Sequence, residues 1–179
     1  MIWLVLLVLV VALFALASRA REPTGSNNGQ AKPRSFTIRE GKAVPTDAAF
    51  DAWTSADLQK MLKALGTRTN KIDRHFLLQG IVQQCYKARS DPKLRAKCLE
   101  IGRLHLEEFP SIAPALKRDM GGTLPRVSTF QHLSTVLTED GEYEKAIEVC
   151  EIAKRFGLHD GTKSGFDGRI ARIRKKQQS

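Results

Sequence analysis

Charged side chains are absent from the start of this chain, and paired cysteines are absent from all of it. No Asp, Glu, Lys or Arg occurs before Arg19. The three cysteines, Cys85, Cys98 and Cys150, are odd in number and form no CxxC pair. This count argues against a disulfide framework or a structural zinc site, and we expect the thiols to pack as small core residues. Reduced thiols fit a cytosolic compartment.

Patterns that would indicate catalysis or metal binding are also lacking. The four histidines have no acidic residue or cysteine at metal-ligand spacing, no HExxH occurs, and we expect each histidine at the surface or at a helix end. The segment Gly157–Ser164, GLHDGTKS, lacks the spacing of a phosphate-binding loop and follows no predicted strand. No set of nucleophile, base and oxyanion donor can be assembled. The sequence therefore predicts no enzyme, no cofactor and no metal site.

The net charge of +10 is concentrated at the two ends of the chain. Residues 18–46 carry a net charge of +4 and residues 163–179 a net charge of +5, so the region between them is nearly neutral. A basic protein of this kind has basic flanks rather than a basic fold.

The apolar run from Met1 to Ala17 predicts a membrane anchor within residues 1–18. A helix of roughly 17 residues is about 26 Å long, near the lower limit for crossing a bilayer core. A cleaved signal peptide is the main alternative, since Ala15-Leu16-Ala17 fits a cleavage site, and a buried helix is another. No basic residue precedes the run, whereas Arg19 and Arg21 follow it. This asymmetry predicts a single-pass protein with its N-terminus outside and its C-terminal domain in the cytoplasm.

Residues 19–46 are predicted to be a flexible basic linker, because proline, glycine and polar residues dominate them. Within this linker, residues 35–38 are predicted to form a short extended piece. Residues 47–179 are predicted to form an all-α domain with no β-strand. Helices are expected to begin near Thr46-Asp47, after Ser55, after Asn70, at Asp91-Pro92 and at Pro125, and the fourth is expected to end near Pro110. Two further helices are expected over residues 142–156 and 166–176.

Residues 130–158 resemble one tetratricopeptide repeat, a helical hairpin of 34 residues. Large and small residues recur at the spacing of that family, although a cysteine replaces its aromatic residue and a leucine its proline: Phe130, Leu133, Ser134, Leu137, Gly141, Tyr143, Ala146, Cys150, Ala153 and Leu158. The spacing recurs 52 residues earlier, from Leu78 to Leu106. The resemblance implies an α-solenoid fragment of antiparallel helical hairpins, with repeats at 75–108 and 127–160, an insertion over 109–126 and a closing helix at 166–176.

In tetratricopeptide proteins the first helix of each hairpin lines a groove that binds peptides. The resemblance therefore implies a partner-binding groove lined by residues of two helices: Phe76, Gln79, Gln83, Tyr86, Gln131 and Thr135. These positions lack the lysines and asparagines with which some family members hold a peptide carboxylate, which argues against an adaptor for chaperone tails.

The basic C-terminal helix provides a second candidate surface. Ile170 and Ile173 are expected to face inward, and the basic residues of the two flanks are expected to face solvent: Arg19, Arg21, Arg169, Arg172, Arg174, Lys175 and Lys176. Such a surface could bind anionic lipid, and nucleic acid less well because no aromatic residue interleaves with the charges. The sequence as a whole predicts a membrane-anchored scaffold that binds a protein partner at the cytoplasmic face. An electrostatic module for lipid or nucleic acid and an exported helical domain are the alternatives.

Overall fold

The computed structural model describes residues 35–179, and these residues are mostly helical, as the sequence predicts. Two strands come first, followed by seven helices: β1 (Phe36–Arg39), β2 (Lys42–Pro45), α2 (Ala48–Thr54), α3 (Leu58–Ala64), α4 (Lys71–Lys87), α5 (Pro92–Asp119), α6 (Ser128–Glu139), α7 (Tyr143–Arg155) and α8 (Gly165–Gln177).

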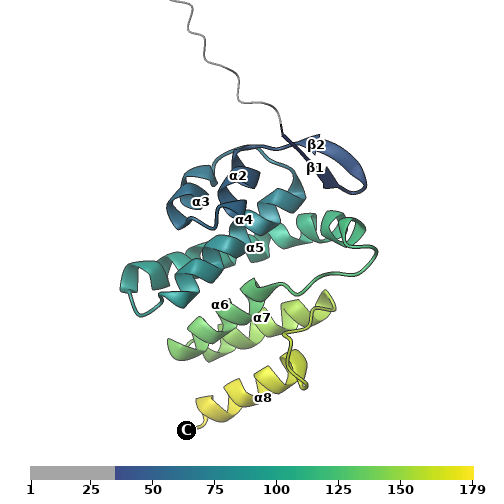
Figure 1. Ribbon diagram of the computed structural model, residues 1–179. Helices are drawn as coiled ribbons and strands as arrows, with labels where there is room; N and C mark the ends of the chain where they lie inside the picture. The colour runs from purple at the N-terminus through teal and green to yellow at the C-terminus, as the bar shows by residue number, and fades with distance from the viewer. Residues whose placement is uncertain (1–34) are drawn as a thin grey trace, which may run out of the picture. The chain divides into compact units, whose positions relative to one another are not determined.

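The helices lie in successive layers, from α2 and α3 through α4 and α5, then α6 and α7, to α8 (Figure 1). The start of α4 contacts the second half of α5, and the end of α4 contacts the start of α5. Lys71 Nζ donates to Ser111 Oγ, and Cys98 Sγ near the start of α5 donates to the Val82 carbonyl near the end of α4. The pair is therefore an antiparallel hairpin. A short turn at residues 140–142 joins α6 to α7 in the same manner.

Side-chain caps fix where most helices begin. Asp47, Asp57, Asn70 and Asp91 each accept hydrogen bonds from backbone N–H groups in the first turn that follows. Asn70 and Asp91 act as predicted, whereas Ser55 does not cap α3. Ser55 is instead the C-terminal cap of α2, and its hydroxyl donates to the Ala52 carbonyl. Asp57 takes the capping role because a carboxylate satisfies two free N–H groups at once.

The predicted linker over residues 19–46 is corrected at its C-terminal end, where β1 and β2 form an antiparallel hairpin. Glu40 and Gly41 connect the strands with φ values of 50° and 75°. Positive φ at both central residues defines the tight turn whose twist matches that of paired strands. The hairpin is fastened to the helices, because Arg39 donates to Asp73 of α4 and Arg118 of α5 donates to Glu40.

Helix α5 does not end near Pro110, and the insertion predicted over residues 109–126 is also wrong in its first half. The helix continues through Pro110 and Pro114 to Asp119. Proline removes a helical hydrogen bond and costs about 3 kcal/mol in a helix interior. Here both rings are exposed, while Phe109, Ile112 and Leu116 between and beyond them are fully buried. Burial of these apolar side chains outweighs the local preference.

The core is continuous through all layers and contains the residues on which the repeat pattern depends. Ser134, Ala146 and Ala153 are completely buried where α6 meets α7, and Phe130 and Leu133 fill the space beside them. All three cysteines are free and buried. Burial raises the pKa of Cys98 to about 12 and that of Cys150 to about 11, so these thiols are protonated core residues.

The predicted location as a single-pass membrane protein with a cytoplasmic domain needs correction. Between residues 35 and 179, no helix is both long and apolar enough to cross a bilayer. The anchor predicted over residues 1–18 lies outside the described residues, as do Arg19 and Arg21.

Candidate functional site

Helices α4 and α6 meet at Tyr86 and His132, and α6 and α8 meet at Thr135 and Arg169; we call the surface that these junctions share the α4–α6–α8 face. Gln83 lies one helical turn from both Gln79 and Tyr86 on α4 and is exposed. At the junction of α4 and α6, the rings of Tyr86 and His132 stack with centroids 4.0 Å apart. Nearer the start of α6, Gln79 Oε1 accepts a hydrogen bond of 2.9 Å from the Ser128 N–H. That bond satisfies a free donor at a helix start that has no side-chain cap.

The junction of α6 and α8 is polar. Arg169 of α8 donates through Nη1 to Thr135 Oγ1 of α6 at 3.0 Å. Its Nε and Nη2 both donate to Asp160 Oδ2 at 3.2 Å and form an ion pair with that carboxylate. Asp160 is fully buried, and burial alone would raise its pKa. Hydrogen bonds from Thr162 and the charge of Arg169 outweigh burial and leave the pKa of Asp160 below its ordinary value. Arg169 is therefore a structural residue, held at 14% exposure, and the prediction that it faces solvent is wrong.

The other expectations for α8 hold in the structure. Ile170 and Ile173 are buried, and the remaining basic residues of the helix are exposed. These exposed residues point to two sides. Arg172 and Lys176 line a hollow between α6 and α8, whereas Arg174 and Lys175 do not.

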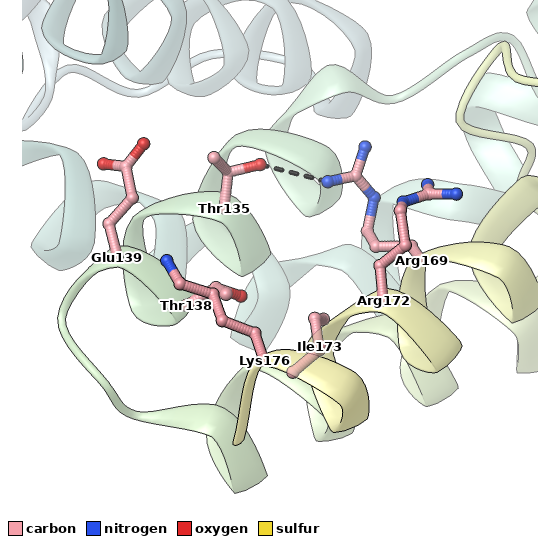
Figure 2. A pocket seen from close by; sticks show the side chains of 7 residues that line it. All are labelled: Thr135, Thr138, Glu139, Arg169, Arg172, Ile173 and Lys176. Carbon is pink, nitrogen blue, oxygen red and sulfur yellow. Dashed lines mark hydrogen bonds between the residues drawn. The ribbon is translucent and has the colours of Figure 1, made fainter. Parts of the chain in front are cut away.

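The hollow has a cavity volume of about 280 Å³ and is open to solvent. In Figure 2, Arg169 and Lys176 extend from α8 toward the threonines of α6, with Arg172 between them along the helix. Its walls combine three cations, two hydroxyl groups, one carboxylate and one apolar side chain: Thr135, Thr138, Glu139, Arg169, Arg172, Ile173 and Lys176. The hydroxyls of Thr135 and Thr138 already donate to backbone carbonyls of α6, so the basic side chains are the main polar groups that the hollow offers to a ligand.

A second hollow adjoins the first and shares Glu139 with it. It is lined by Lys87, Arg89, Ser90, Arg95 and Glu139. Arg89 and Arg95 both bind the Glu139 carboxylate, and hydrogen bonds from Arg89 are the largest cause of the lowered pKa of Glu139. Arg89 also lies over the Tyr86 ring, 4.1 Å from its centroid.

The six residues predicted to line a groove differ in how accessible they are. Phe76 is covered by Trp53 of α2, whose ring stacks on it at 4.8 Å, and Gln79 is engaged at the start of α6. Gln131 accepts from Arg126, and Thr135 is bound to Arg169. Tyr86 is half-buried, and Gln83 is exposed. Most of these residues therefore join neighbouring layers, and Gln83 offers the freest side chain of the set.

Two histidines lie in the core, contrary to the prediction that all four lie at the surface or at helix ends. His75 of α4 and His105 of α5 are fully buried and form a hydrogen bond of 3.1 Å, and His105 Nδ1 lies 2.8 Å from Thr129 Oγ1. Within residues 35–179, no group of three or more His, Cys, Asp or Glu side chains could hold a metal ion.

Comparison with known proteins gives little independent information about this face. The chain is 25% identical over 122 residues to an uncharacterized protein of Aquifex aeolicus (strain VF5), an alignment that covers 68% of this chain. The chain spans about half the length of that relative, since the alignment covers 55% of it. No family model matches the chain. No solved structure matches it either.

Sequence reasoning missed the basic residues that line the second hollow. Lys87 and Arg89 follow Tyr86 at the end of α4, and Arg95 lies in the first turns of α5. A signal was present, because the nine residues 87–95 around the turn between α4 and α5 contain four basic side chains. That they meet Glu139 of α6, more than forty residues further along, depends on how the hairpins stack.

Proposed function

We propose that this chain is a helical-repeat scaffold of the tetratricopeptide type that binds a protein partner through the α4–α6–α8 face. One observation carries the proposal: alternate helices meet on this face. Tyr86 stacks on His132 to join α4 to α6, and Arg169 binds Thr135 to join α6 to α8. Repeat scaffolds present a binding surface in this way, with one helix of each hairpin facing the ligand and the other covering the back.

The packing of the second hairpin supports the same proposal. Small side chains at Ser134, Ala146 and Ala153 are completely buried between α6 and α7. Gly102 of α5 approaches Leu133 of α6 so closely that an added Cβ would lie 3.1 Å from its Cδ1. Small residues at helix contacts hold one layer tightly on the next, and a rigid stack keeps its binding surface preorganised.

Site-specific photocrosslinking tests the proposal. A photoreactive amino acid replaces Gln83, which is exposed on the α4–α6–α8 face, and in a matched variant it replaces Glu148, which is exposed on α7. We expect a discrete protein adduct from position 83 in cells and none of the same mass from position 148. Purified partner should then bind the full chain, and Gln83→Arg should weaken that binding. Adducts of equal yield from both positions, or none from either, would contradict a partner on this face.

A further inference from the structure

The two hollows of the α4–α6–α8 face form one continuous basic surface. Glu139 lies between them and lines both. Lys87, Arg89 and Arg95 line one hollow, and Arg169, Arg172 and Lys176 line the other. The two hollows together therefore contain six cations and share one carboxylate.

Ion pairs within the chain neutralise only half of these cations. Arg89 and Arg95 are paired with Glu139, Arg95 is also paired with Asp140, and Arg169 is paired with buried Asp160. Lys87, Arg172 and Lys176 have no carboxylate partner within residues 35–179, and the only hydrogen bond of Arg172 is a long one, 3.4 Å, to Ser164 Oγ.

His132, which stacks on Tyr86, also lies near several of these cations. Its pKa is lowered to about 4, first by burial and then by the charges of Arg126, Arg169, Arg89 and Lys87. Lys87, Arg89 and Arg169 of the two hollows are among these charges, so both hollows lie near the His132 ring.

We infer that the partner docks through an acidic segment of its chain, whose carboxylates pair with Arg172, Lys176 and Lys87. This inference rests on the proposed function and adds the chemistry of the partner. Charge complementarity of this kind accelerates association and selects against partners of the wrong charge.

Two other anionic ligands fit the surface less well. Small-molecule sites are enclosed and bury most of their ligand, whereas this hollow is open to solvent and has three basic side chains in its walls. Single-stranded nucleic acids need open aromatic faces for base stacking. Both faces of the Tyr86 ring are taken, one by His132 at 4.0 Å and the other by Arg89 at 4.1 Å, because two such groups cannot share one face.

A peptide selection followed by a titration tests the inference. A random short-peptide library is selected on the full chain, and the most enriched peptide is labelled with fluorescein and titrated by fluorescence anisotropy. The test variant carries Arg172→Glu with Lys176→Glu, and Arg172→Gln with Lys176→Gln provides a milder version. The matched control carries Arg174→Glu with Lys175→Glu, the same change of charge on exposed residues of the same helix that lie outside the hollow. Circular dichroism verifies that all variants remain helical.

We expect enriched peptides rich in Asp and Glu, at least about tenfold weaker binding in the charge-reversed test variant, and less than about twofold change in the control. Peptides without acidic residues, or equal losses in test and control variants, would overturn the acidic segment. The proposed function would survive that outcome if position 83 still crosslinks a partner, and both would fall if it does not. Tighter binding of a single-stranded oligonucleotide through Arg172 and Lys176 would overturn the inference in favour of nucleic acid.

Discussion

His75 Nδ1 lies 3.1 Å from His105 Nε2 in the buried contact between α4 and α5. Burial lowers the pKa of His75 to about 4, and burial, followed by the charges of His75 and Arg74, holds the pKa of His105 well below its ordinary value. Both rings are therefore neutral in the folded protein at pH 7. If both became protonated, two N–H groups would face each other, and even one added proton would place a charge in the core.

This pair predicts loss of stability in mild acid. The unfolded chain protonates its histidines below about pH 6.5, whereas the folded chain resists until pH approaches 4, so the unfolded state binds more protons in that window. Stability is present above pH 6.5 and falls as the pH is lowered. His75 alone should reduce the free energy of unfolding by about 2 kcal/mol between pH 7 and pH 5.

Urea unfolding followed by circular dichroism at pH 7, 6 and 5 measures this effect. His75→Leu should lower stability at pH 7, because His105 loses its partner, and should make the decline toward pH 5 shallower. His159→Leu, at an exposed loop position, is the control. Equal stability at pH 7 and pH 5 in the natural chain would show that the pKa values of the buried histidines are not lowered by folding.

Arg39 should contribute to stability although it lies in a strand before the first described helix. Its Nη2 is 2.6 Å from Oδ1 of Asp73, a carboxylate that is 1% exposed and also accepts from Trp53 Nε1. Arg39→Ala leaves that charge buried with only neutral donors and should cost about 2 kcal/mol in chemical denaturation. Lys97→Ala breaks an exposed pair with Glu100 and should cost less than about 0.5 kcal/mol. Equal costs would mean that the hairpin is not part of the folded unit.

Pro110 should be a destabilising residue that the packing of α5 tolerates. The ring is exposed and lies inside a helix, where proline removes a hydrogen bond. Pro110→Ala should restore this hydrogen bond. Part of the gain is lost, because proline lowers the conformational entropy of the unfolded chain and alanine does not. The net effect should be a free energy of unfolding higher by about 1–2 kcal/mol. Thermal unfolding checks this prediction, with Glu107→Ala at an exposed position of the same helix as the control. A lower melting temperature for Pro110→Ala would contradict it.

Gly102 should be essential for the contact between α5 and α6. An added Cβ would meet Leu133 Cδ1 at 3.1 Å, and the two extra methyl groups of valine would force Leu133 out of its place. Gly102→Val should therefore destabilise the protein by about 2–3 kcal/mol despite its better helix propensity. Ala96→Val makes a similar change at an exposed position of α5 and should cost less than about 1 kcal/mol. Chemical denaturation measures the free energy of unfolding of the two variants. Equal losses would show that the contact between α5 and α6 does not require a glycine at position 102.

The sequence alone determined the helical class, several helix starts and the inner residues of the second hairpin. Asn70 and the Asp91-Pro92 pair carry local capping chemistry that acts within one turn, so their effect can be read without the fold. Phe130, Ser134, Ala146 and Cys150 follow helical periodicity, and Ile170 and Ile173 do the same in α8. Each of these predictions depends on neighbours along the chain.

The tertiary structure alone decided the rest. Continuing α5 past two prolines is favourable only because Phe109, Ile112 and Leu116 are buried in the core of the fold. The hairpin at residues 36–45 is held against the helices by Asp73 and Arg118, which lie far along the chain. Arg169 turns inward because Asp160 is buried beside it, and Lys87 comes to share a surface with Lys176 because α6 places Glu139 between them. Long-range burial and charge pairing depend on which segments meet, and local sequence patterns do not contain that information.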